Sequence, residues 1–359
     1  MHPKLGMLAL VVLMALAFVP RFAPAAETIS TPYYKVLPAI QHGNLIIFPV
    51  VANQTHPTQE FLTLDEGLRS GEVIVTESGS VRPMIRRRRP IPNPGVGAQV
   101  NQLVLVNNST RPLILLAGEI VTGGKQDRVI GADRLVPPES DPIDLSVFCV
   151  EPGRWTGASM SFKSLGSAMA QPAVRAKAMG DKDQQKVWSE VGKTREALAM
   201  AVPPGSAPAI AGTSSYARVM ENDEVKQKVE SVAEPIQHNY QSLIKQLREQ
   251  NAVGVVAAVN GQIVWADLFA STDLLQKYWP KLVRSYATEA IVTRAKEQEV
   301  KVEHAQQFLN RMEGGHETVD SEPGLYRHTE ISGDGFKAFQ LTSLLPKTGF
   351  ALHIAKMAE

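Results

Sequence analysis

Two apolar runs that meet at Asn260-Gly261 constrain the fold of this chain more than any other feature of its sequence. An Asn-Gly pair between apolar segments favours a type I′ turn, because both residues tolerate a positive φ angle. We therefore predict an antiparallel β-hairpin over residues 253–269. Antiparallel pairing is then part of the fold, whatever helices surround it.

Other segments indicate strands on both sides of this hairpin. They are short apolar or alternating runs bounded by turn residues, a pattern that is typical of strands. These predicted strands cover residues 44–51, 72–77, 100–106 and 112–121, and a three-strand meander follows over residues 324–355. A short helix is predicted over residues 63–71.

Helical periodicity dominates the second half of the chain. Residues 183–201 and 223–249 are predicted helices, separated by a linker rich in Pro, Gly, Ser and Ala over residues 202–215. A third helix is expected from Thr272 to about residue 296. We expect Pro235 to kink or divide the second helix and Pro280 to start a new one.

These elements predict an α+β fold with mixed and antiparallel sheets built from β-hairpins, several packed helices, and the helices concentrated in the second half. A hydrophobic content of 44% in 359 residues is typical of a globular protein with a sizeable core. We expect residues 27–359 to form a single large α+β domain, with a helical and linker insertion at about residues 157–250.

The first 26 residues have the pattern of a secretory signal peptide. His2 and Lys4 precede a mostly apolar run over residues 5–19, and Ala23-Pro24-Ala25 supplies the small residues that a signal peptidase requires. We therefore expect an exported protein, periplasmic or secreted; the alternative is an uncleaved N-terminal anchor. Because no later run reaches 18 apolar residues, no transmembrane span is expected after cleavage.

Charge and cysteine content exclude several classes of function. A formal net charge of +1 gives no global attraction to nucleic acid, so no nucleic-acid partner is expected. The single cysteine, Cys149, excludes an intrachain disulfide framework, and its apolar neighbours predict an inert buried thiol. The histidines lack metal-ligand spacing, so no metal site is predicted, and the sequence assigns no cofactor.

Charged and amide side chains are concentrated near Gly123-Gly124, within the apolar segment 113–134. A two-residue turn at the glycines would place Glu119 opposite Arg128 and put Gln126 on the same face of the hairpin. Glu119 and Asp127 are then candidate catalytic carboxylates, and Lys125, Gln126 and Arg128 are candidate ligand-binding residues. The alternative is a cross-strand ion pair that fixes the register of the hairpin.

Two further groups of residues are candidates for binding. Glu151, Arg154 and Trp155 follow the strand of Cys149 and are expected to form the lip of a ligand site; the alternative is a turn packed by the tryptophan. The basic, proline-rich loop over residues 82–94 contains four consecutive arginines. A cell-envelope partner is expected to bind there, and the alternative is a solvated loop. The four arginines are Arg86, Arg87, Arg88 and Arg89.

Three stretches resemble the ARG and Rhodanese-Phosphatase-superfamily-associated protein domain family. They are residues 118–128, residues 147–155, and the run from Asn260-Gly261 through residues 267–269 to residues 278–282. The resemblance covers most of residues 30–300 and implies an uncharacterised α+β domain linked to ADP-ribose or NAD-derived nucleotides. We therefore expect binding, with or without processing, of a small anionic ligand at the hairpin face; the alternative is a non-catalytic envelope-binding module.

Overall fold

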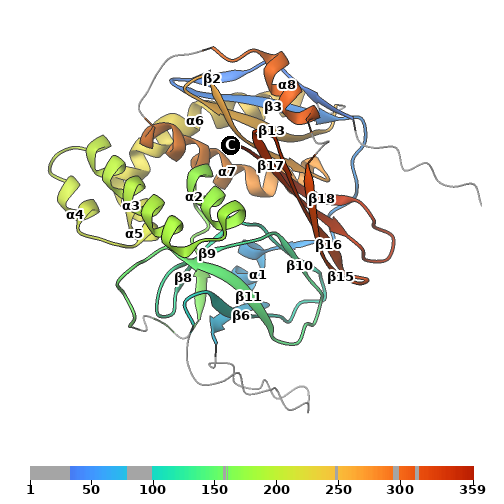
Figure 1. Cartoon of the computed structure of the whole chain (residues 1–359), viewed down its shortest axis with the longest axis horizontal. Coiled ribbons are helices and arrows are strands. Elements are labelled where there is room, and N and C mark those ends of the chain that lie inside the picture. Colours follow the sequence, from blue (N-terminus) through green and yellow to red (C-terminus); the bar gives the residue numbers. More distant parts are fainter. Residues whose placement is uncertain are drawn as a thin grey trace, which may run out of the picture. The chain divides into compact units, whose positions relative to one another are not determined.

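One large antiparallel sheet, two smaller sheets and a group of helices make up the described part of the chain (Figure 1). The structure is a computed structural model that describes residues 33–78, 99–156, 159, 161–246, 250–293, 299–311 and 315–359. The predicted signal peptide over residues 1–26 and the basic loop with Arg86, Arg87, Arg88 and Arg89 lie outside these ranges.

The large sheet runs in the order β1-β3-β13-β14-β18-β17-β16-β15, with β2 also paired to β3. The predicted hairpin is confirmed, because Asn260 (φ 53°) and Gly261 (φ 76°) join β13 to β14 with the positive φ angles of a type I′ turn. The predicted C-terminal meander is β16 to β18. The strands are β1 Tyr34–Val36, β2 Ile40–His42, β3 Leu45–Ala52, β13 Ala252–Val259, β14 Gln262–Phe269, β15 His316–Glu322, β16 Tyr326–Gly333, β17 Phe336–Ser343 and β18 Ala351–Ala358.

The two smaller sheets are formed by the segment that carries the predicted site. One has the order β10-β7-β4, in which β4 and β7 are parallel, and the other has the order β12-β8-β9-β11-β6-β5. Their strands are β4 Leu62–Thr63, β5 Val73–Glu77, β6 Gln102–Asn107, β7 Leu113–Leu115, β8 Ile120–Gly123, β9 Arg128–Ile130, β10 Arg134–Val136, β11 Ile143–Cys149 and β12 Phe162–Ser164. Helix α1 (Leu64–Ser70) begins directly after β4, at a capping box formed by Thr63 and Glu66.

Most of the described helices follow residue 170, and three of them (residues 223–246, 272–292 and 302–310) contact strands of the large sheet. The helices after residue 170 are α2 Pro172–Ala176, the π-helix η1 Lys177–Asp181, α3 Gln184–Ala201, α4 Ala207–Ala211, α5 Tyr216–Glu221, α6 Asp223–Gln246, α7 Thr272–Val292 and α8 Val302–Asn310. Helix α7 contacts β3 and β13, and α6 lies beside α7 (Figure 1). Within the described ranges, no helix has both the length and the apolar character needed to cross a membrane.

Pro235 does not divide its helix and Pro280 does not start a new one, so these two predictions are wrong, while a kink at Pro235 stays a prediction. Helix α6 is one helix through Pro235, and Pro280 lies inside α7. A proline in a helix interior costs about 3 kcal/mol. In α7, buried Tyr278 and Trp279 precede Pro280 and buried Leu282 follows it, so core packing on both sides offsets that cost.

The core contains residues from the whole described chain, which explains the α+β architecture. Leu198 of α3 and Tyr240 of α6 belong to the same buried cluster as Trp265 of β14 and Leu116 of the β7–β8 turn. Residues 33–359 form one compact unit. The predicted α+β fold class, with helices concentrated in the second half, is confirmed.

The predicted strand over residues 112–121 is interrupted by a tight turn. Gly118 has φ +96°, a value that L side chains rarely adopt, and the Glu119 amide donates to the Leu116 carbonyl at 3.1 Å. A Cβ at Gly118 would lie 2.7 Å from Cγ of Arg175. The turn therefore separates β7 from β8 and places them in different sheets.

A buried polar network joins distant parts of the fold. Nδ1 of His353 (β18) lies 2.5 Å from Oδ2 of Asp133, and its Nε2 lies 3.1 Å from Oδ1 of Asp267 (β14). Arg175 (α2) donates both Nη atoms to Asp267 at 2.8 and 2.9 Å, and Tyr286 (α7) donates its hydroxyl to the same carboxylate. Burial acts against a charged imidazole, but the two carboxylates prevail and raise the pKa of His353 to about 9.

Candidate functional site

The hairpin that carries the predicted site has a longer loop than expected. Val121, not Glu119, is opposite Arg128, so four residues separate β8 from β9 and the two-residue turn at Gly123-Gly124 is wrong. The predicted Glu119–Arg128 pair does not form, and Ile130 is the residue whose amide donates to the Glu119 carbonyl. The loop is longer than expected because side chains from other parts of the chain accept hydrogen bonds from its backbone amides.

Glu119 belongs to a separate ion cluster under helix α7. Its carboxylate lies 2.5 Å from Nζ of Lys281 and accepts the Leu116 amide at 2.8 Å. Lys281 also contacts Asp65 at 2.7 Å. Burial and the second carboxylate raise the pKa of Glu119, while both carboxylates together overcome burial and raise the pKa of Lys281. With 1% of its surface exposed, Glu119 closes the turn after β7 and is remote from the loop.

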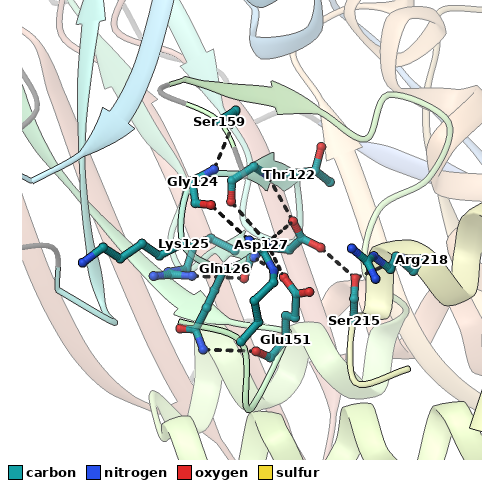
Figure 2. Close-up of polar contacts among 12 residues, drawn as sticks. Thr122, Gly124, Lys125, Gln126, Asp127, Glu151, Ser159, Ser215 and Arg218 are labelled. Carbon is teal, nitrogen blue, oxygen red and sulfur yellow. Dashed lines mark hydrogen bonds and ion pairs between the residues drawn. The ribbon is translucent and has the colours of Figure 1, made fainter. Parts of the chain in front are cut away.

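Three of the predicted residues form a clamp inside the loop (Figure 2). We call Asp127, Glu151 and Arg154 the loop clamp. Glu151 accepts the Asp127 amide at 3.0 Å and pairs with Nη2 of Arg154 at 2.5 Å, while the same Nη2 lies 3.5 Å from Asp127. The Asp127 carboxylate accepts the Gly123 amide at 3.1 Å and the Ser215 hydroxyl at 2.7 Å. Burial raises the pKa of Asp127, and the hydrogen bond to Glu151 raises that of Arg154.

Residues that the sequence did not predict complete the support of the loop. Glu77, the last residue of β5, accepts the Lys125 amide at 2.6 Å, and the Ser159 hydroxyl accepts the Gly124 amide at 3.2 Å. Arg154 also donates to the carbonyls of Gly124 and Thr156. Glu77 and Ser159 lie 48 and 35 positions from the residues whose amides they bind, and no local pattern predicts these contacts.

Gln126 and Arg128 are turned inward and hold the loop to its surroundings. Nε2 of Gln126 donates to the Glu151 carbonyl at 3.1 Å, and Nε of Arg128 donates to the Val100 carbonyl at 2.8 Å. Arg128 is fully buried, and burial lowers its pKa. Oε1 of Gln126 and Nη2 of Arg128 are buried without a hydrogen-bond partner among the described residues. Both side chains thus connect the loop to its surroundings, and their predicted ligand-binding role stays a prediction.

Lys125 and Trp155 lie on the outside of the loop, and we call them the Lys125–Trp155 pair. Nζ of Lys125 lies 4.9 Å from the ring centroid of Trp155, and the indole is 43% exposed. The Lys125 side chain extends away from the carboxylates of the clamp (Figure 2). Within the described ranges, no carboxylate lies within ion-pair distance of its ammonium. A cation and an exposed aromatic face are thus held together on a fixed loop.

The described residues contain no group of three or more His, Cys, Asp or Glu side chains able to hold a metal ion. Cys149 is buried, as its apolar neighbours predicted, and burial raises the pKa of its thiol. A raised pKa keeps the thiol protonated and unreactive. The loop therefore offers binding groups at its surface and fixed charges inside.

Comparison with known proteins gives one match. The sequence model of a family described as ARG and Rhodanese-Phosphatase-superfamily-associated Protein domain matches residues 33–356. No curated protein and no solved structure matches the chain significantly. The match covers all the described strands and helices except the final residues of β18, including both sides of the charged loop.

Proposed function

The chain belongs to the ARG and Rhodanese-Phosphatase-superfamily-associated protein domain family, and from that premise we propose that it binds a small anionic, nucleotide-like molecule at the Lys125–Trp155 pair. The observation that carries this proposal is the position of the Lys125 ammonium 4.9 Å over an indole that is 43% exposed. An ammonium binds a phosphate, and an exposed indole stacks on a base or sugar ring. ADP-ribose is the probe that we choose, because the resemblance noted in the sequence implies a link to ADP-ribose or NAD-derived nucleotides.

The fixed loop supports binding at this position. The Lys125 amide is held by Glu77, and Arg154, which precedes Trp155, is held by Glu151 and by loop carbonyls. Both members of the pair therefore follow backbone that is fixed before a ligand arrives, which lowers the entropy cost of binding. The fixed ammonium of Lys125 and the ring of Trp155 together favour ligands that have an anionic group close to a ring of their own.

Binding, and not catalysis, is the activity that we propose. The two candidate catalytic carboxylates have exposures of 1% for Glu119 and 6% for Asp127, and each is occupied by donors of the chain itself. Neither belongs to the exposed Lys125–Trp155 pair. Export, and an envelope partner at Arg86, Arg87, Arg88 and Arg89, stay predictions from the sequence.

The test is a thermal-shift and calorimetric titration with ADP-ribose. A ligand at 100 times its Kd stabilises the folded chain by about 2.7 kcal/mol, which raises Tm measurably. We expect Lys125→Gln and Trp155→Ala each to weaken ADP-ribose binding about tenfold, equivalent to about 1.4 kcal/mol. Lys35→Gln, at an exposed position of strand β1, makes the same charge change elsewhere and is the matched control.

Two outcomes would contradict this function. One is the absence of any shift with ADP-ribose, NAD or inorganic phosphate. The other is a shift that Lys125→Gln and Trp155→Ala leave as large as in the unmodified chain. Adenosine tests the ring alone and phosphate tests the charge alone, so weaker binding of both than of ADP-ribose is also expected.

A further inference from the structure

A cavity of about 140 Å³ lies between η1, the β15–β17 meander and the segment before β10, away from the charged loop. Its charged and polar side chains are Lys182, Thr318, Asp320, His328 and Glu330. Figure 1 shows β15 and β16 beside β10, at the edge of the large sheet opposite β1. We propose that this cavity binds a small organic amine, a molecule with one ammonium group and a short apolar body.

The strand register explains why these side chains meet in one place. Thr318 is opposite Glu330, and Asp320 is opposite His328, on the antiparallel strands β15 and β16. Because side chains alternate between the faces of a strand, all four project from the same face of this hairpin. Phe339 of β17 is opposite Glu330 and extends the face with an apolar ring.

The charge of the cavity favours a cation. Asp320 and Glu330 contribute two negative charges against the single ammonium of Lys182. Nζ of Lys182 lies 2.7 Å from Glu330, and its side chain is 59% exposed. No cation among the described residues lies within ion-pair distance of Asp320. Glu330 thus already binds the ammonium of Lys182, and the Asp320 carboxylate is left to bind the ammonium of a ligand.

His328 provides the acceptor that distinguishes a nitrogen donor. Its Nε2 is buried and has no hydrogen-bond partner within the described ranges. Burial lowers the pKa of His328, an effect opposed by Asp133, Asp320 and Glu330 and reinforced by Lys182. A neutral imidazole with its proton on Nδ1 accepts a hydrogen bond at Nε2. An ammonium N–H of the ligand would satisfy this nitrogen and pair with Asp320.

The remaining walls set the size and the apolar part of the ligand. Met179 of η1, Ala132 and Phe339 give the cavity an apolar surface. A cavity of about 150 Å³ holds a molecule the size of benzene, with about six non-hydrogen atoms. Lys182 (φ 52°) takes a left-handed conformation directly after the π-helix, and π-helices are frequent at functional sites. The predicted ligand is therefore an alkylamine of about five or six non-hydrogen atoms.

The experiment titrates the whole chain with butylammonium and follows binding by calorimetry and NMR. 1-Butanol and butyrate have the same apolar body without the positive charge, and we expect neither to bind measurably. Asp320→Asn removes a charged partner and His328→Phe removes the hydrogen-bond acceptor, and each is expected to weaken butylammonium binding about tenfold. Asp334→Asn, in the exposed β16–β17 turn, makes the same change outside the cavity and is the matched control.

A third variant gives an effect of the opposite sign. Lys182→Met removes the ammonium that occupies Glu330, so butylammonium should bind several-fold tighter. Asp320 is exposed, so its variant should fold as the unmodified chain does, and circular dichroism checks this. Equal binding of 1-butanol, or butylammonium binding unchanged in both Asp320→Asn and His328→Phe, would overturn the proposal. Lys125→Gln should leave butylammonium binding intact, which separates this site from the Lys125–Trp155 pair.

Discussion

The stability of this protein should fall as the pH rises from 6.5 to 8, because of one buried histidine. His353 has a pKa of about 9 in the folded chain, against the ordinary value of 6.5 expected after unfolding. A pKa that is raised on folding stabilises the fold fully below the unfolded value, and this stabilisation disappears as the pH rises through the folded value. Between these two values, only the folded chain holds the proton.

The size of the effect follows from the shift. With the full shift, the protonated His353 contributes about 3 kcal/mol to the free energy of unfolding, and about 2 kcal/mol of that is lost between pH 6.5 and 8. Glu289 acts in the same direction, because burial raises its pKa to about 7, and its titration should remove about 1 kcal/mol more over this range. Burial lowers the pKa of Lys356 to about 8, so above pH 8 the unfolded chain holds this proton more strongly and the stability rises with pH. The measured range therefore stops at pH 8.

The assay is equilibrium unfolding in urea at four pH values from 6.5 to 8, at constant ionic strength and with a thiol reductant for Cys149. Glu289→Gln is the matched variant, because its amide oxygen still accepts the Ala173 amide that Glu289 binds at 3.0 Å but does not titrate. We expect the unmodified chain to lose about 3 kcal/mol and the variant about 2 kcal/mol. A variant whose free energy of unfolding is constant over this range would refute a charged His353.

Two other predictions concern the turn after β7. Gly118→Ala should destabilise by about 2 kcal/mol more than Gly153→Ala. The two glycines have similar φ angles of +96° and +92°, but an added Cβ would lie 2.7 Å from Cγ of Arg175 at Gly118 and would meet no atom within 4 Å at Gly153. Urea unfolding of both variants measures the difference. Glu119→Gln should cost about 3 kcal/mol, because it removes the charge of one carboxylate partner of buried Lys281, and should leave ADP-ribose binding unchanged. Loss of that binding in a stably folded Glu119→Gln chain would restore Glu119 as a functional residue.

Elements fixed by local chemistry were predictable from the sequence. Asn260-Gly261 alone selects the type I′ turn that joins β13 to β14, and the Thr63–Glu66 capping box starts α1 where helical spacing begins. Pro280 misled the prediction because a local penalty was outweighed by core contacts of its neighbours in α7. Gly118 lies in an apolar run, where one glycine gives no local sign of a break.

The candidate site was predicted in composition but not in arrangement. Asp127, Glu151 and Arg154 do meet, yet the loop that contains Asp127 takes its shape from Glu77 and Ser215, which are far away in the sequence. The register of a hairpin depends on the length of its turn, so an error of two residues in the turn was enough to misplace the partner of Glu119. The cavity beside η1 depends on the register between β15 and β16, and local sequence patterns do not give that register.

The position of β18 has a consequence for the order in which the chain folds. This last strand lies between β14 and β17, so the large sheet is in two parts until residues 351–358 have been synthesised. His353 of β18 also contacts Asp133, which lies 220 positions earlier in the chain. Such non-local pairing slows folding, because the entropy of closing long loops is lost before contacts form. The sheet therefore completes only after β18 itself has left the ribosome, and before then β14 and β17 present open edges to other chains.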